Sequence, residues 1–205
     1  LRRTGPLARR LGQRALVAVA DLGQPWIEPI WGEVGASLRE HGVACQAVVG
    51  AAPNAPREDV YRIALRLCQS QGAFIIAVGG GSTIDASKAA ALLVSYTPEE
   101  VQQALGVSAA AAGTLEPFFG VGKVSRVKEA VGRPVLPIMA VQTAASSSSH
   151  LTKGSLSTDP VTGQKRLVSD VALFPSAAVF DYEVMANAPR RLTVDGGLDG
   201  IAHAW

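Results

Sequence analysis

The 205-residue sequence has little cysteine, few aromatic residues and almost no net charge. Its two cysteines, Cys45 and Cys68, form no CxxC pair, which argues against a disulfide framework or a metal knuckle and fits a reducing cytoplasm. The formal charge of +2 is too small to indicate nucleic-acid binding. No apolar run approaches the roughly 20 residues of a membrane-spanning helix, so we expect no membrane partner.

The remaining composition is that of an ordinary globular chain. Hydrophobic residues make up 48% and charged residues 18%, which excludes a disordered protein. The length suits a single domain with a substantial core. Several arginines precede the first acidic residue, Asp21. We interpret them as the solvated face of a short helix, with an organelle-targeting segment as the alternative.

Helical and strand patterns alternate through the first half of the chain, which predicts a parallel sheet with right-handed crossovers. A further strand, a β-hairpin and a final helix beginning near Thr193 follow. The stretch Thr97–Pro134 has the least regular pattern, and we expect an extended surface excursion there. The predicted strands are Leu16–Ala20, Ala44–Val49, Phe74–Val78 and Val135–Ala140, the helices Trp26–His41, Arg57–Ser70 and Ser82–Ser95, and the hairpin strands Leu151–Ser157 and Lys165–Ser169.

A glycine triplet follows the most apolar of these strands. The run Phe74–Val78 lacks alternation, as a strand covered on both faces does, and glycines 79–81 permit close backbone approaches. Ser82 is a predicted N-cap, Asp85 completes a capping box, and Lys88 is the i+3 partner of Asp85. The helix N-terminus suits a pyrophosphate, but the spacing is neither GxGxxG nor a P-loop. Phosphate binding and a plain strand-to-helix turn therefore both stay open.

The segment GLDGIAH near the C-terminal end places Asp199 and His203 four residues apart. In a helix these positions share one face, and a carboxylate with an imidazole suits Fe²⁺ or Zn²⁺. A surface helix pair is the alternative. Two ligands are also fewer than a metal site usually has.

Together these motifs resemble those of the iron-containing (group III) alcohol dehydrogenases. GGGSTIDASK is similar to that family's GGGSxxDxxK signature, and GLDGIAH to its GxDAxxH metal-binding helix. Further similar blocks follow in the family's order: ALVAVAD at 15–21, APNAPRED at 52–59, PIMAVQTAASSSSHLT at 137–152 and QKRLVSDVALFPSAAVFD at 164–181. The resemblance implies an α/β fold with a Rossmann-like parallel sheet flanked by helices and carrying a β-hairpin.

The resemblance also implies site residues. Asp21 would bind the adenosine ribose and repel a 2′-phosphate, which favours NAD over NADP. Asp199 and His203 would bind Fe²⁺ or Zn²⁺, and no catalytic residue beyond these ligands is assigned. The implied cofactor-binding residues are Asp21, Asn54, Gly79, Gly80, Gly81, Ser82, Thr83, Thr143, Ser146 and Lys165.

The chain departs from the family pattern in two places. Where the family has GTGSE, this sequence has the run Ser146–Ser149 followed by His150, so the serines are either cofactor donors or a flexible loop, and His150 has no assigned role. The family continues into a helical half with two more metal-binding histidines, whereas this sequence ends at Trp205. We therefore expect a dinucleotide-binding domain over residues 1–192 and the start of a truncated helical metal-binding domain over 193–205.

The function that the resemblance implies is an NAD(P)-dependent and divalent-metal-dependent alcohol dehydrogenase acting on a small-molecule alcohol or aldehyde. We expect a cytoplasmic homodimer. The alternatives are a dehydroquinate-synthase-like lyase that uses NAD and a metal, and a non-catalytic nucleotide-binding module.

Overall fold

A five-stranded parallel sheet forms the centre of the computed structural model, which describes residues 1–145, 147–186 and 188–205 without the side chains of residues 192, 203 and 204. The strand order is β2-β1-β3-β5-β8, so the chain places β2 on one side of β1 and then β3 on the other. The direction of winding thus reverses between β1 and β3, where open α/β sheets bind ligands. The strands are β1 (Arg14–Val19), β2 (Ala44–Val49), β3 (Phe74–Gly79), β5 (Ile138–Gln142) and β8 (Ala177–Phe180), which confirms the predicted parallel sheet.

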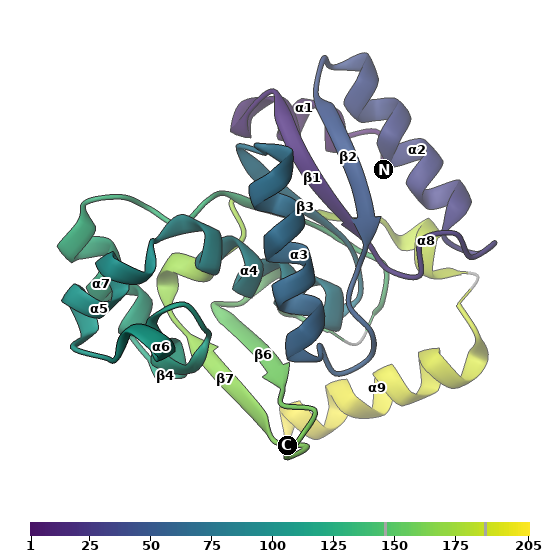
Figure 1. Ribbon diagram of the computed structural model, residues 1–205. Helices are drawn as coiled ribbons and strands as arrows, with labels where there is room; N and C mark the ends of the chain where they lie inside the picture. The colour runs from purple at the N-terminus through teal and green to yellow at the C-terminus, as the bar shows by residue number, and fades with distance from the viewer. Residues whose placement is uncertain (146, 187) are drawn as a thin grey trace.

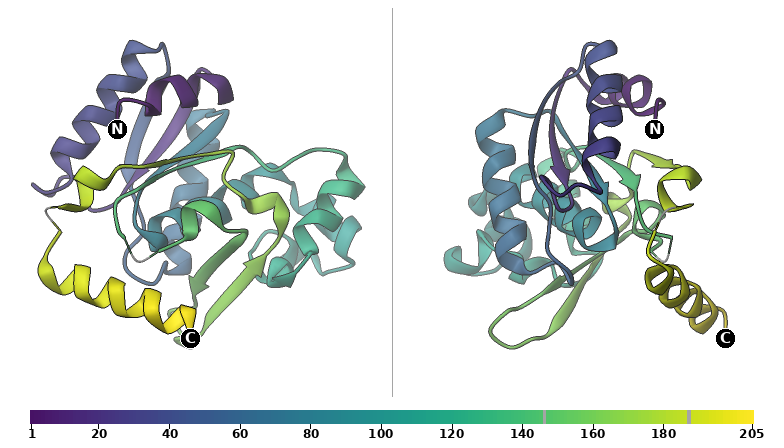
Figure 2. Two further views of the ribbon diagram at one scale, coloured as in Figure 1. Left: turned by 180° about the vertical axis from the view of Figure 1, so that it is seen from behind. Right: turned by 90° about the vertical axis from the view of Figure 1, so that its right-hand side faces the viewer.

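Helices cover both faces of this sheet. Phe74 and Ile76 pack with α1 (Thr4–Leu11) and α2 (Glu28–Glu40), whereas Ile75 packs with α3 (Arg57–Ser70) and α4 (Gly81–Ser95). The right-hand view of Figure 2 shows α3 and the α1–α2 pair on opposite sides of the sheet. Each such buried side chain contributes about 1.5–3 kcal/mol, which explains why β3 is apolar throughout.

The predicted surface excursion over Thr97–Pro134 is wrong, because this stretch folds into a small helical unit that joins the core. Its first helix begins with a capping box, in which Thr97 and Glu100 bond each other's backbone N–H groups. Val101 and Val124 are buried in the same cluster as α3 and α4. The elements are α5 (Pro98–Leu105), α6 (Ala109–Ala112), η1 (Glu116–Phe118), β4 (Gly120–Val121) and α7 (Lys123–Val131).

The predicted hairpin is confirmed as the antiparallel pair β6 (Gly154–Thr158) and β7 (Lys165–Ser169). Its first strand begins later than expected because the short helix η2 (Ser149–Leu151) occupies the preceding residues. Strand β4 pairs with β7 and completes a second sheet of three strands. After the hairpin, η3 (Val171–Leu173) leads toward β8.

The C-terminal part of the chain forms α8 (Tyr182–Ala186) and α9 (Arg190–Ala204). Helix α9 begins three residues before the predicted Thr193, directly after Pro189 in an extended conformation. Figure 1 shows the carboxyl ends of β1 and β2 pointing toward the side of the molecule on which the hairpin and α9 lie. Over the residues that the structure describes, no helix combines the length and the apolarity needed to cross a membrane.

Candidate nucleotide-binding and metal site

The glycine triplet forms the N-terminus of α4 at the β1/β3 switch point. Strand β3 ends at Gly79, Gly80 is extended (φ −81°, ψ −171°), and α4 begins at Gly81 without a described side-chain cap. The first backbone bond of the helix runs from the N–H of Ile84 to the carbonyl of Gly80 at 3.1 Å. The N–H groups of the preceding turn and the positive end of the helix dipole are therefore suited to an anion.

Ser82 does not cap this helix, contrary to the prediction. Its hydroxyl accepts a hydrogen bond from the N–H of Asn54 at 3.0 Å. Asn54 and Ala55 lie in a left-handed turn (φ 70° and 47°), in the loop between β2 and α3. Ser82 thus holds this loop against the glycine turn. Asn54 therefore lies beside the glycines, which the family resemblance assigns to the cofactor together with Asn54.

Packing excludes a Cβ at Gly79 more strictly than at Gly80. A Cβ on Gly79 would lie 2.8 Å from Cβ of Thr83 and 2.9 Å from Cβ of Ala20, distances that real Cβ atoms do not show. Thr83 is fixed there because its hydroxyl accepts from the N–H of Ala51 at 3.2 Å. A Cβ on Gly80 would have Cβ of Ala144, at 3.3 Å, as its nearest described neighbour. A side chain at Gly80 therefore fits only if Ala144 shifts by a few tenths of an ångström.

Two further predicted residues flank the glycine turn. Thr143 directly follows β5, is buried, and donates its N–H to the carbonyl of Gly79 at 3.1 Å. Asp21 is exposed in the turn after β1 and has a left-handed backbone conformation (φ 48°). Both lie at the carboxyl end of the sheet, on either side of β3 in the strand order.

Lys165 is the predicted residue that lies on the hairpin. It is exposed at the start of β7, opposite Thr158 of β6. Thr158 donates its hydroxyl to the carbonyl of Asn54 at 2.6 Å and its N–H to the carbonyl of Ala55 at 3.0 Å. The hairpin is thereby held against the Asn54 turn, which places Lys165 on the same side of the molecule. Ser146, the remaining predicted contact, lies outside the described residues.

The acid and the lysine of the GGGSTIDASK segment form a buried pair that anchors the hairpin. Asp85 accepts from the N–H of Leu156 at 3.1 Å, so the predicted capping box is wrong. Lys88 is fully buried, donates to the carbonyls of Thr152 and Gly154 at 2.8 Å each, and lies 3.8 Å from Asp85. Burial raises the pKa of Asp85, although the positive charge of Lys88 acts to lower it. Burial also lowers the pKa of Lys88 to about 8.

We expect Lys88→Met to lower the free energy of unfolding by about 3 kcal/mol, because two buried carbonyls lose their donor and Asp85 loses its cation. The pKa of Lys88 is depressed on folding, from 10.5 to about 8, so the unfolded state holds this proton to higher pH. The stability of the unmodified protein relative to the variant should therefore rise between those pH values. Urea unfolding at pH 7 and pH 10 measures both effects. Lys128→Met, at an exposed position on α7, is the matched control, and equal stability of the two variants would contradict the assignment.

A cavity of about 510 Å³ lies between α4, the hairpin and α9. Asp85, the serines 147–149 and Asp199 line it, so the predicted metal ligand on α9 faces the same space as the segment after β5. His203 follows one helical turn later on α9, but its side chain lies outside what the structure describes. Among the described residues no cluster of three or more His, Cys, Asp or Glu could hold a metal. A carboxylate is a chemically suitable ligand for a divalent ion, and Asp199 alone does not make a site.

Sequence reasoning missed two residues that order the serine segment. Gln142 is fully buried at the end of β5, and its amide nitrogen donates to the carbonyls of Ala144 and Ser147. His150 is buried and stacks on Phe180 at 5.3 Å between ring centroids, and burial lowers the pKa of its imidazole. The signal for Gln142 was a lone amide at the end of an apolar strand, whereas the partner of His150 comes from β8 and has no local signal.

These features identify the chain as a doubly wound α/β protein with a glycine turn at its switch point. A model of the family "Iron-containing alcohol dehydrogenase" matches residues 1–182. The chain belongs to the iron-containing alcohol dehydrogenase family, which confirms the resemblance seen in its motifs.

Individual relatives agree with this assignment. The chain is 30% identical over 204 residues to the probable alcohol dehydrogenase EutG of Salmonella typhimurium, covering 98% of this chain and 38% of that protein. It is 28% identical over 172 residues to the NAD-dependent methanol dehydrogenase of Bacillus methanolicus, covering 84% and 39%. Among solved structures, 1,3-propanediol oxidoreductase matches with a TM-score of 0.82 at 25% identity, covering 99% of this chain and 47% of that one. The chain thus spans less than half the length of these relatives.

Proposed function

We propose that this chain is the cofactor-binding portion of an alcohol dehydrogenase that depends on NAD(P) and a divalent metal. The observation that carries the proposal is the N-terminus of α4 at the β1/β3 switch point, which has no side-chain cap among the described residues and begins in a glycine turn. A pyrophosphate there would accept hydrogen bonds from backbone N–H groups and neutralise the helix dipole. Membership of the family supports the same assignment.

The residues divide the proposed task between them. Glycines 79–81 with Ser82 and Thr83 would hold the pyrophosphate, and Asn54, Thr143 and Lys165 border it. Fe²⁺ or Zn²⁺ at Asp199 and His203 would act as a Lewis acid on the oxygen of an alcohol or aldehyde. The bound nicotinamide would supply hydride chemistry, and the protein's part would be to keep cofactor, substrate carbon and metal in register.

Helix α9 supports the proposal that residues 193–205 open a further helical part. Its side chains Val194, Leu198 and Ile201 recur at helical spacing and are about half exposed or more. An exposed apolar stripe of this kind favours packing against another element. The division at residue 192, the homodimer and the cytoplasmic location stay predictions.

The preference for NAD over NADP depends on Asp21. Because its φ is 48°, Asp21→Gly removes the carboxylate without straining the turn. We expect NAD to bind more tightly than NADP to the unmodified protein, and Asp21→Gly to narrow that difference by about tenfold or more, since the carboxylate bonds the ribose and repels a 2′-phosphate. Calorimetric titration with both cofactors measures the ratio, and Asp195→Gly on exposed α9 is the control. Equal affinities for NAD and NADP in the unmodified protein would contradict this placement. One of the relatives is named an NADPH-dependent butanol dehydrogenase, so a preference for NADP is the alternative result.

A further inference from the structure

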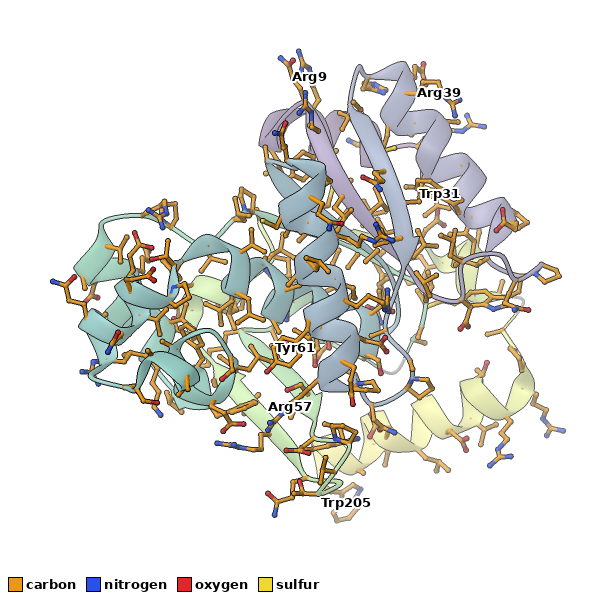
Figure 3. The ribbon with its side chains drawn as sticks, viewed as in Figure 1. Arg9, Trp31, Arg39, Arg57, Tyr61 and Trp205 are labelled. Atoms are coloured by element: carbon orange, nitrogen blue, oxygen red, sulfur yellow. The ribbon has the colours of Figure 1, made fainter. Side chains whose placement is uncertain are left out.

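One carboxylate of the helical unit, that of Glu116, joins two arginines from different segments. Oε1 of Glu116 lies 2.6 Å from Nη1 of Arg57, and Oε2 lies 2.5 Å from Nη1 of Arg166. Arg57 is the first residue of α3, and Arg166 lies on β7 of the hairpin. Figure 3 shows Arg57 at the lower end of α3, where it meets the hairpin. Glu116 therefore connects three segments that are far apart in the sequence.

The two guanidinium groups are also held by an aromatic ring. The central carbons of Arg57 and Arg166 lie 4.8 Å and 4.0 Å from the ring centroid of Phe119, which is buried. Asp159, in the hairpin turn, lies 3.2 Å from Nη1 of Arg57. Cation–π contacts and paired carboxylates fix the orientation of planar guanidinium groups more strongly than one exposed ion pair does.

Glu116 stays ionised in this arrangement. Burial works to raise the pKa of its carboxyl, but the hydrogen bond from Arg166 and the charges of both arginines outweigh it and lower that pKa. The backbone bonds of Val161 and Thr162 similarly lower the pKa of Asp159. The charges of the two carboxylates and the two guanidinium groups cancel, so the cluster has no net charge that would attract a ligand of its own.

The cluster lies beside two residues that are proposed to bind the cofactor. Arg57 follows Asn54 by three residues, and Arg166 is the neighbour of Lys165. The hairpin is attached to the Asn54 turn on its other strand, through the bonds that Thr158 makes to Asn54 and Ala55. The distance between the Asn54 turn and the start of β7 is thus set from two sides, by Thr158 and by Glu116.

We propose that Glu116 is a positioning residue for the cofactor, which holds Asn54 and Lys165 at a fixed separation by bridging Arg57 and Arg166. This inference rests on the proposed function, because that function assigns Asn54 and Lys165 to the cofactor. In this role Glu116 would act through Arg57 and Arg166 and would not itself contact the cofactor. Without the bridge, the bonds from Thr158 and the ion pair between Asp159 and Arg57 remain, so the hairpin keeps one attachment to the Asn54 turn and loses the other. The additional ordering that cofactor binding must then supply weakens binding.

The expected effect falls on cofactor affinity and not on the hydride step. The protein to use is a chain extended through the helical half that the family resemblance implies, called the full-length protein below. In it, Glu116→Gln should raise the Kd and the KM for NAD about tenfold, with kcat within about twofold. Arg166→Gln should give a similar loss, and the double variant should lose little more than either single variant, because all three interrupt one bridge. Glu129→Gln, at an exposed position on α7, should bind NAD as the unmodified protein does.

The test compares the affinity for NAD of the four variants with the unmodified protein, alongside steady-state kinetics and thermal unfolding. A tenfold loss of affinity in Glu116→Gln and Arg166→Gln, non-additive in the double variant and absent in Glu129→Gln, supports the inference. If the unmodified protein binds NAD and both single variants bind it equally well, the positioning role is wrong while the proposed function stands. If the unmodified protein binds no NAD, the proposed function and this inference both fail.

Discussion

Replacing His203 by Ala in the full-length protein is expected to remove the metal and at least about 99% of the alcohol dehydrogenase activity together, while NAD binding persists. The physical reason is coordination: a catalytic Zn²⁺ or Fe²⁺ site needs at least three protein ligands, so the loss of one leaves too few to hold the ion. The residues proposed to bind the nucleotide lie at the carboxyl end of the sheet, at the start of α4 and on the hairpin, and none of them is on α9, which is why cofactor affinity should not follow metal content.

This expectation is measured by elemental analysis, NADH formation from an alcohol, and calorimetric titration with NAD on the same preparation. His41→Gln, at the end of α2, replaces a histidine far from α9 in the fold and should leave all three values unchanged. A His203→Ala protein that keeps its full metal content and activity would contradict the assignment of α9 to the metal. By the same argument, the 205-residue chain alone should bind Fe²⁺ or Zn²⁺ weakly and have negligible dehydrogenase activity.

Gly80→Val should weaken NAD binding by about 100-fold or more while the fold is largely retained. A side chain at Gly80 would lie in the turn before α4, where the pyrophosphate would approach the backbone, and the extended conformation of this residue is open to any amino acid. Because Cβ of Ala144 is the nearest described atom, at 3.3 Å, the protein itself needs to shift only slightly. We expect the free energy of unfolding to change by about 1 kcal/mol or less.

Two glycine variants make this result specific. Gly32→Val places the same side chain on α2, where the described atoms leave open space, and should bind NAD normally. Gly79→Ala should instead lower stability, because its Cβ would overlap Thr83 and Ala20. Normal NAD binding by a folded Gly80→Val protein would remove the phosphate site from this turn.

The sequence predicted the sheet and its glycine turn because the relevant patterns are local. The unbroken apolar run of β3 followed by glycines requires a strand buried on both faces and a tight turn, and the structure has both. The grouping of Asn54 with the glycines came from the family resemblance, and Ser82 supplies its physical cause.

The errors arose where distant segments decide the outcome. Ser82 and Asp85 have the spacing of a capping box, but each bonds a partner far away in the sequence, Asn54 and Leu156. These two bonds fix the Asn54 loop and the hairpin against α4, and the spacing of residues along the sequence carries no information about such tertiary partners. The helical unit over 97–134 was missed for a related reason: its alanines and glycines weaken the periodic signal, and its burial depends on contacts with α3 and α4.

The most direct test of the account is NADH formation from NAD and a small alcohol by the full-length protein, followed before chelation, after complete removal of metal, and after addition of Fe²⁺ or Zn²⁺. The account predicts activity that disappears on chelation and returns with the metal, while the metal-free protein still binds NAD. Undiminished dehydrogenase activity after complete metal removal would contradict it.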